Sequence, residues 1–484
     1  MLIKNKWMKN AALTILIVVF LIACFIALNL YLDKLDITPI DFTQDKRYSI
    51  TDDTKNQIKD IEQNVTIYFF GYEDSSSAVT IAKQYQDVND KIRVLNVKAS
   101  ENPELATKFG VSSESQIIAV TSNQRNKIID SSETYTYDSS TGKTIDITEQ
   151  KITNAILDVT IEKKPQVYFL TGHEEGGITD DNTYLSQFIT NEVYDVNSLD
   201  LLTSDMPEVC DVLIISDPKK DFSSVETEKI KNYIKNGGKI IWLQNPYITT
   251  VENYTSSTFP NINSVLAEYG ISFSKGIVCE ESADNVVSNS PDIIIPELTY
   301  NEIVKDIYTD GKIIMMDAGK ITNESDEKME ELGVTASAFV KTSDKAYYKE
   351  KFDSQNGSLS KSSDDETGSF ILGETLEKKI NDDKTSTLVA YSNAYFVSNK
   401  GMYIGNNAYT YPISLRNNKD IILNTVAYLS KREDSIRIRK DVGLVSFDTP
   451  TEKQNAIVQI IVFGIPILII IIGIIVSIVR RHRK

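Results

Sequence analysis

The sequence predicts an α/β protein in which two α/β domains lie between two apolar helices that cross a membrane. Three observations lead to this fold class. Short apolar runs typical of strands, such as residues 65–70 and 212–216, alternate with segments of helical periodicity. Residues 10–32 and 454–479 contain no charged side chain. All acidic residues lie between Asp33 and Glu452, so the charged side chains at the two ends are all basic.

The two uncharged runs determine the predicted domain organisation. A helix rises about 1.5 Å per residue and a hydrocarbon core is about 30 Å thick, so each run is long enough to cross it. We expect a tail at 1–9, a transmembrane helix at 10–32, a first α/β domain at 33–160, a second α/β domain at 161–435, a membrane-proximal linker at 436–453, a transmembrane helix at 454–479 and a basic tail at 480–484.

A removable signal peptide is the alternative interpretation of the first run, because basic residues followed by an apolar stretch also begin such peptides. Residues 21–24 resemble a lipoprotein cleavage box, in which Cys24 would carry the lipid. The apolar run continues to Leu32, where a mature lipoprotein normally turns polar, and this favours an uncleaved helix. Cleavage and lipidation at Cys24 stay open.

The charge distribution predicts the orientation. The 484 residues include 51 Lys and Arg and 68 Asp and Glu, a net charge of −17. Seven bases lie in the two tails, and without them the net charge falls from −17 to −24. Positive flanks stay in the cytoplasm, so both termini are predicted to be cytoplasmic and the large domain extracytoplasmic, at the cell membrane. An acidic domain repels phosphate backbones, which argues against a nucleic-acid partner.

The first domain is predicted from an alternation of strands and short helices. Strands are expected at 65–70, 92–97 and 116–121, helices at 78–88 and from Pro103 to Gly110 with Asn102 as N-cap, and a hairpin over 135–143. Ser49 and Asp52 form a weak capping-box pattern before an earlier helix, and a helix carrying Ile152 and Ile156 follows the hairpin. This order is thioredoxin-like. No Cys-x-x-Cys follows the first strand, so redox chemistry is not predicted.

The second domain is predicted to contain a parallel sheet covered on both faces, because strands alternate with helices. Strands are expected at 166–170, 194–199, 212–216 and 239–243, with a helix at 185–191. Ser223 and Glu226 form a capping box for a further helix that ends at Gly237. Later elements are helices at 262–269 and 419–429 and strands at 313–317 and 388–391.

Few residues in the sequence are suited to catalysis or to the binding of a cofactor or metal. Thr141 to Thr144 contains the Gly-Lys-Thr of a phosphate-binding loop, but Tyr137 stands where its first glycine should be. Of the two histidines, His482 lies in the basic tail. His173 follows the predicted strand 166–170, at the edge where open α/β sheets place their sites.

The main interpretation of His173 is a structural turn over 172–177. The alternatives are a ligand or partner contact made by His173 and Glu174, and catalysis by His173. Cys210 precedes its strand and does not stand on a sharp turn after it, so it is not predicted to be a nucleophile. We predict no catalytic residue, no metal site and no cofactor, and we leave a pairing of Cys210 with Cys279 open.

Several segments, taken in order, resemble the gliding-motility auxiliary proteins of the GldG type, which are auxiliary components of ABC-type transport systems. The segments are 41–43, 46–51, 165–173 ending in Gly-His, 210–218, the capping box with Gly237 and Gly238, 262–270, and a last span that contains Pro466 and precedes a basic tail. The chain departs at Glu174 and Glu175, where many relatives continue with Gly-Glu. The second domain also resembles the class I glutamine amidotransferase fold, without its catalytic Cys and His pair.

The resemblance implies a fold of thioredoxin-like order followed by a glutamine-amidotransferase-like parallel sheet. It also implies a non-catalytic auxiliary subunit that works with separate ABC-type permease and ATPase subunits and presents an extracytoplasmic domain next to them. The alternative functions are an extracytoplasmic sensor that binds a small ligand at the carboxyl edge of the second sheet, and a His173-dependent ecto-hydrolase.

Overall fold

The computed structural model describes residues 49–432, with gaps at 113–114, 139–142, 251–254, 256–257, 351–358 and 405–407, a few positions within 16–27, and Gly473. The chain divides into two compact units, Met1–Ile50 and Thr51–Lys484. The predicted linker, the second membrane helix apart from Gly473, and both tails lie outside the described residues.

The predicted first membrane helix is described only in part. Residues 22–27 are helical, and the side chains of Ile22, Phe25 and Ile26 are more than half exposed. Within the part of the chain that the structure describes, no helix combines the length and the apolar character that a bilayer crossing needs.

The second unit begins with a four-stranded sheet in the order β2-β1-β3-β4. Its strands are β1 (Val65–Phe70), β2 (Ile92–Val97), β3 (Ile117–Ser122) and β4 (Arg125–Asp130). β1 is parallel to β2 and antiparallel to β3, and β3 is antiparallel to β4. β1 and β2 have the predicted bounds, β3 begins one residue later than predicted, and β4 lies outside the predicted strands.

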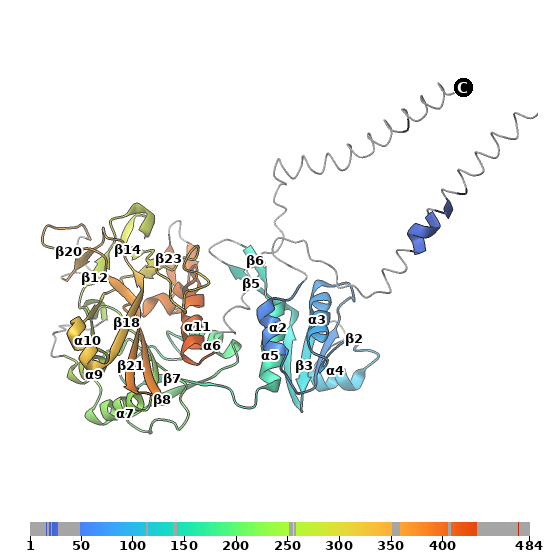
Figure 1. The fold of residues 1–484 in the computed structure, drawn as a ribbon, viewed down its shortest axis with the longest axis horizontal. Helices are drawn as coiled ribbons and strands as arrows, with labels where there is room; N and C mark the ends of the chain where they lie inside the picture. Colours follow the sequence, from blue (N-terminus) through green and yellow to red (C-terminus); the bar gives the residue numbers. More distant parts are fainter. Residues whose placement is uncertain are drawn as a thin grey trace, which may run out of the picture. The chain divides into compact units, whose positions relative to one another are not determined.

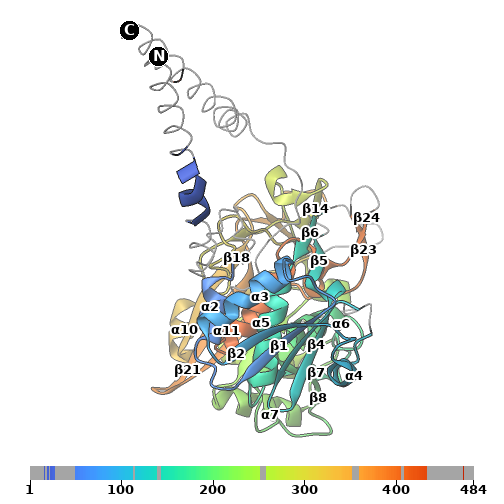
Figure 2. The ribbon, with the colours of Figure 1, turned by 90° about the vertical axis from the view of Figure 1, so that its right-hand side faces the viewer.

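Helices α2 (Asp52–Ile58), α3 (Ser77–Val88) and α5 (Thr148–Thr160) lie side by side against this sheet (Figure 2). Gly110, in the left-handed region at φ +66°, ends α4 (Pro103–Phe109) as predicted. One predicted cap is wrong: Thr51, directly before α2, accepts the N–H of Thr54, and Ser49 lies too far upstream to do so. Asn102 occupies the predicted N-cap position of α4, but its side chain makes no cap hydrogen bond, and its amide donates to the carbonyl of Lys98.

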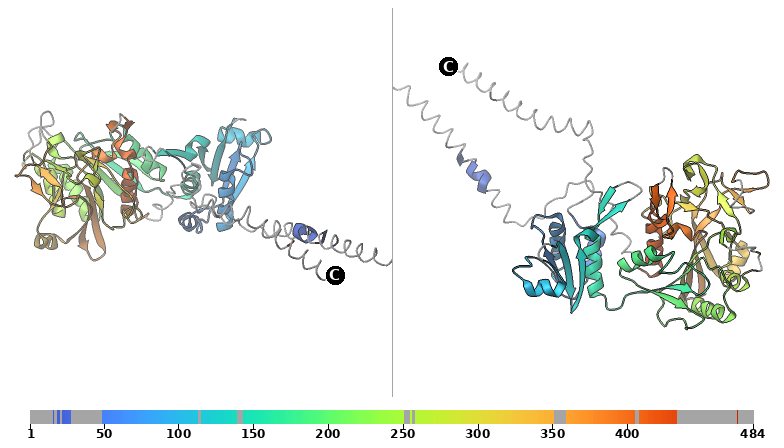
Figure 3. Two further views of the ribbon diagram at one scale, coloured as in Figure 1. Left: turned by 90° about the horizontal axis from the view of Figure 1, so that it is seen from above. Right: turned by 180° about the vertical axis from the view of Figure 1, so that it is seen from behind.

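The predicted hairpin is present as a separate two-stranded sheet. Strands β5 (Tyr135–Asp138) and β6 (Lys143–Asp146) pair antiparallel and project from the four-stranded sheet (Figures 1 and 3). Lys143 and Thr144 of the sequence that resembles a phosphate-binding loop therefore lie in a strand. A phosphate-binding loop would need them between a strand and a helix.

The larger sheet has a parallel half that contains the predicted strands. Its strands are β22 (Lys384–Tyr391), β10 (Lys239–Leu243), β9 (Val212–Ser216), β7 (Gln166–Thr171) and β8 (Asp195–Asp200), in that order across the sheet. All neighbours in this half pair parallel. The prediction of a parallel sheet is therefore confirmed for these five strands.

Helices cover both faces of the parallel half. On one face, α6 (Thr183–Asn191) and α11 (Asn418–Leu429) pack with Ile214 and Ile241 in one buried cluster. On the other face, α7 (Ser224–Lys235) and α9 (Pro260–Leu266) pack with Leu213 and Ile240 in a second cluster. Successive strand residues point to opposite faces, so strands with apolar residues at every position have one core on each side.

Beyond β22 the sheet continues with antiparallel strands that the sequence interpretation did not include, giving ten strands in all. These are β21 (Ile371–Asn381), β17 (Ile321–Asn323), β11 (Ile271–Phe273), β18 (Val334–Lys341) and β15 (Glu297–Leu298). The predicted strand 313–317 is reduced to β16 (Met315–Met316).

The remaining elements are short. They are α8 (Tyr247–Thr250), β12 (Ile277–Cys279), β13 (Val286–Val287), β14 (Ser290–Ile294), α10 (Asp326–Leu332), β19 (Tyr347–Lys349), β20 (Glu366–Thr367), β23 (Met402–Ile404), β24 (Ala408–Thr410), and 3-10 turns at Ser131–Thr134, Ala267–Tyr269, Ala283–Asn285, Tyr395–Val397 and Pro412–Ser414.

Candidate functional site

The candidate site lies at the carboxyl edge of the parallel strands. Polar residues follow each of four neighbouring strands: the loop 172–177 after β7, Asp217 after β9, Gln244 and Asn245 after β10, and Asn393 shortly after β22. Because parallel strands end at the same edge of a sheet, these loops lie together. Gly176 has no room for a side chain, since a Cβ there would approach the Asn182 amide to 2.7 Å.

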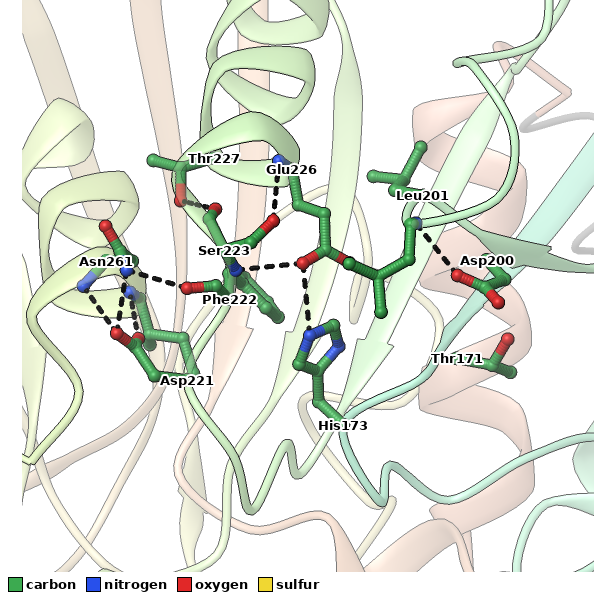
Figure 4. Close-up of polar contacts among 12 residues, drawn as sticks. Thr171, His173, Asp200, Leu201, Asp221, Phe222, Ser223, Glu226, Thr227 and Asn261 are labelled. Atoms are coloured by element: carbon green, nitrogen blue, oxygen red, sulfur yellow. Dashed lines mark hydrogen bonds and ion pairs between the residues drawn. The ribbon is translucent and has the colours of Figure 1, made fainter.

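His173 is buried between two carboxylates. Its side chain is 6% exposed, and its Nδ1 lies 3.2 Å from Oε1 of Glu175. Its Nε2 lies 3.3 Å from Oε2 of Glu226 (Figure 4). Its backbone N–H donates to Oε2 of Glu175 at 2.6 Å. The ring also packs edge-on against Phe222. The imidazole therefore connects the loop after β7 with the first turn of α7.

The two carboxylates decide the charge of His173. A neutral imidazole has one N–H, whereas both ring nitrogens here face carboxylate acceptors, so the imidazolium satisfies both contacts. Burial opposes the charge and lowers the pKa of His173, but the hydrogen bonds and charges of Glu175 and Glu226 outweigh it and raise that pKa above its usual value. The group is thus a buried ion triplet with one net negative charge.

Glu174 does not join His173. Its backbone is in the left-handed region at φ +62°, and its side chain is 58% exposed, with Oε1 2.7 Å from Nζ of Lys220. The lysine hydrogen bond and charge lower the pKa of Glu174. The structure therefore separates the two predicted contact residues: His173 is inside, and Glu174 is on the surface.

Glu226 has a second role at the start of α7. The predicted capping box is confirmed, because Ser223 Oγ accepts the N–H of Glu226 at 3.3 Å and Glu226 Oε2 accepts the N–H of Ser223 at 2.8 Å. The same Oε2 faces His173. Glu226 is 1% exposed, and its Oε1 has no hydrogen-bond partner among the described residues. A carboxylate near a helix N-terminus is also favoured by the helix dipole.

A second polar group links the ends of β9, β10 and β22. Asp217, at φ +56°, accepts hydrogen bonds from Nε2 of Gln244 at 2.9 Å and from Nδ2 of Asn245 at 2.8 Å. Oδ1 of Asn245 accepts the backbone N–H groups of Ala394 and Tyr395. Burial raises the pKa of Asp217 above its usual value, against the lowering effect of Asn245. These bonds hold three strand ends in one arrangement.

The sequence interpretation did not identify Glu175 as a partner of His173 or Asn245 as a partner of Asp217. One signal for the second pair is present: Asp217 and Asn245 each follow a predicted strand and each precede proline. For Glu175, position alone does not separate it from Glu174, because the two carboxylates are adjacent and only the turn decides which one points inward.

Thiol and metal chemistry have little support in the described part of the chain. Burial raises the pKa of both Cys210 and Cys279 to about 12, and both thiols are free. Among the described residues, no group of three His, Cys, Asp or Glu side chains could hold a metal ion. The polar groups at the carboxyl edge mostly bond to each other, which suits them to hold the loops in place.

A cavity of about 690 Å³ lies at the opposite, amino edge of the sheet. It is lined by residues that precede or begin β9 and β10, such as Cys210 and Lys239, by Tyr233 of α7, and by Leu429 to Lys431 at the end of α11. Nζ of Lys239 donates to the carbonyl of Thr385 and to Oγ1 of Thr387. His173 and Glu174 do not line this cavity.

Two solved structures have low similarity to this chain. One is described as "mmIFT52 N-terminal domain", with 14% identity, 55% of this chain and 97% of the other covered, and a TM-score of 0.38. The other is "Structure of PurLQS from Thermotoga maritima", with 8% identity, 55% and 100% covered, and a TM-score of 0.26. Both TM-scores are too low to support a conclusion about fold or function.

One protein family matches part of the chain. No curated protein matches the sequence. Residues 164–292 match a family described as "ABC-type uncharacterized transport system". The matched segment begins just before β7 and includes the His173 loop, the capping box of α7 and the Asp217 and Asn245 turns. The segment that builds most of the candidate site, without Asn393 to Tyr395 after β22, is therefore similar to a family of auxiliary proteins of ABC-type transport systems.

Proposed function

We propose that this protein is a non-catalytic auxiliary subunit of an ABC-type export or transport system. In this proposal it presents an extracytoplasmic domain next to separate permease and ATPase subunits. The observation that carries the proposal is the family match over residues 164–292, which contains the His173 loop, the capping box of α7 and the Asp217 and Asn245 turns of the carboxyl-edge site. The ordered resemblance to GldG-type proteins along the rest of the chain supports the same assignment.

The geometry of His173 supports a non-catalytic role. A general base needs a ring nitrogen within reach of a substrate proton. Both nitrogens of His173 face buried carboxylates, and its side chain is 6% exposed. The site is therefore suited to hold the loop 172–177 in place, with Glu174 exposed on its surface beside Lys220 of the loop after β9.

Co-purification tests the proposal. The full chain, carrying an affinity tag and expressed in its own cells, is solubilised in mild detergent, and the proteins recovered with it are identified by mass spectrometry. We expect one ATPase with a phosphate-binding loop and one multi-span permease, absent from a control with an unrelated tagged membrane protein. Recovery of the chain alone, across several mild detergents, would argue strongly against an auxiliary subunit.

The proposed topology has two membrane helices, at 10–32 and 454–479, with both termini in the cytoplasm. Single cysteines introduced by Lys6→Cys or Asp364→Cys, in a chain whose native cysteines are replaced, test it with a membrane-impermeant maleimide. We expect labelling of Asp364→Cys in intact cells and of Lys6→Cys only after permeabilisation. Equal labelling of both in intact cells contradicts the topology.

The cavity at the amino edge favours a second candidate, an extracytoplasmic ligand-binding sensor. Its volume of about 690 Å³ is within the range of small-molecule sites, about 300–1,000 Å³. A ligand that binds only the folded state raises the unfolding temperature by mass action. A shift seen with an envelope component in the unmutated chain, and lost on narrowing the cavity by Asn232→Trp, at an exposed lining position of α7, would favour the sensor.

A further inference from the structure

Glu374 is a buried carboxyl group with an incomplete set of hydrogen bonds. It lies in β21 with a fully buried side chain, and its Oε2 accepts a hydrogen bond from Nδ2 of Asn323 in β17 at 3.0 Å. Two oxygens of this pair, Oε1 of Glu374 and Oδ1 of Asn323, are buried and have no partner among the described residues. An unpaired buried polar atom is destabilising, so this pair calls for an explanation.

One proton on Glu374 satisfies both oxygens. An ionised carboxylate offers only acceptors, and the amide oxygen of Asn323 is also an acceptor. A neutral acid can donate its O–H to that amide oxygen while its other oxygen accepts the amide N–H, which gives two hydrogen bonds between the two groups. Burial raises the pKa of Glu374 from 4.5 to about 7, against the lowering effects of the Asn323 bond and the Lys341 charge.

The surroundings offer Glu374 little compensation for a negative charge. Ala338 of β18 and Ala390 of β22 are its cross-strand neighbours, and Ile271 of β11 is opposite Asn323. Lys341, on β18, is the charged residue whose field acts on Glu374. The acid is therefore enclosed by apolar residues on the neighbouring strands, with one basic group nearby.

The pair lies where the outer strands join the main sheet. β17 pairs with β21 at Ile321 and Ile371 alone, whereas β11 pairs with β17 over three residues. The chain just before β17 is held separately, because the N–H of Gly319 donates to the carbonyl of Ser392. We propose that Glu374 and Asn323 form a proton-dependent clasp that fastens β11 and the end of β17 to the sheet, closed when the acid is neutral and loosened when it ionises.

Trp242 can report the state of this clasp. It lies in β10, is 1% exposed, and packs against Phe273 of β11 with ring centroids 6.5 Å apart. The chain contains two tryptophans, so Trp7→Phe leaves Trp242 as the single emitter. The experiment uses the full chain with this substitution, in detergent. As the pH rises, we expect the Trp242 emission to shift to longer wavelength and its quenching by acrylamide to increase, in a transition near pH 7.

Three variants identify the group that causes the transition. Glu374→Gln keeps both hydrogen bonds to Asn323 and cannot ionise, so the transition should disappear while the folded emission stays. Glu377→Gln makes the same chemical change at an exposed position of the same strand and should leave the transition in place. Since His173 also titrates and packs on Phe222 beside Trp242, the transition must persist in His173→Gln. A transition unchanged in Glu374→Gln overturns the proposal.

An infrared measurement on the unmutated chain covers the case in which a variant does not fold. A protonated carboxyl group has its own carbonyl stretching band, and ¹³C-labelled glutamate separates the Glu bands from those of the buried aspartates. We expect a glutamic acid band at pH 6 that is lost by pH 8.5. Its absence at pH 6 shows that Glu374 is already ionised, and the clasp is then ruled out.

Discussion

His173→Gln should destabilise the second unit strongly, because it removes the cation from the buried triplet. The side chains of Glu175 and Glu226 are 0% and 1% exposed, so their charges stay buried after the substitution. Glutamine can donate to one of the two carboxylates and leaves the other without a donor. Removing one partner of a buried ion pair lowers the unfolding free energy by roughly 3–5 kcal/mol. Because the glutamine keeps one hydrogen bond, we expect a loss at the lower end, about 3 kcal/mol.

The effect should depend on pH. The pKa of His173 is raised in the folded chain above its usual value of 6.5, so its stabilising contribution is fully present below that value. It is lost as the pH rises through the folded-state pKa. The unmutated chain should therefore lose stability from about pH 6.5 upward through deprotonation of His173, and this component should be absent in His173→Gln.

Urea unfolding followed by the emission of Trp242 measures both effects in the Trp7→Phe background. Phe222 lies between the two residues, with ring centroids 5.0 Å from His173 and 6.1 Å from Trp242, so the emission reports this part of the core. Adding Glu226→Gln to His173→Gln removes one buried charge and should recover part of the loss. An unchanged unfolding midpoint for His173→Gln at pH 6 would show that the triplet contributes nothing.

Other predictions concern the same edge of the sheet. Ser223→Ala removes the N-cap of α7 and should lower the unfolding free energy by about 1 kcal/mol, with Ser224→Ala, one residue later, as the matched control. Glu174→Ala should leave the unfolding midpoint and the co-purified proteins unchanged, since its contact with Lys220 is exposed; loss of a partner protein would instead identify Glu174 as a contact. Asn245→Asp keeps the side-chain shape but places a second carboxylate beside Asp217, so urea unfolding should show a lower stability at pH 8 than at pH 5. Asn245→Ala should lower the unfolding free energy by about 3 kcal/mol at both pH values.

Elements with strong local signals were predicted correctly. Strands β1, β2, β9 and β10 have the predicted bounds, and the capping box at Ser223 and Glu226 is present. Continuous apolar runs and reciprocal caps depend on residues close together in the chain, so the sequence contains the necessary information. The N-cap at Thr51 was missed because two nearby residues, Ser49 and Thr51, both suit the role.

The antiparallel half of the larger sheet was harder to predict. Strands such as β11 and β17 are three residues long, and β21 pairs with β18, whose paired residues lie 30 to 44 positions earlier. Short strands have no periodicity to recognise, and their pairing depends on long-range contacts. The prediction of site residues shows the same limit. His173 was singled out, but its partners Glu175 and Glu226 were not paired with it, and Glu174 was grouped with it although it points outward.

The sequence by itself determined which side chains are available for catalysis or binding, and it determined the class of fold. One histidine outside the basic tail, the missing first glycine of a phosphate-binding loop, and strands alternating with helices are properties of composition and local order. Only the tertiary structure decided what His173 and Glu374 do. The charge of a side chain depends on which groups surround it and on whether water reaches it, and folding brings those groups together from distant parts of the chain.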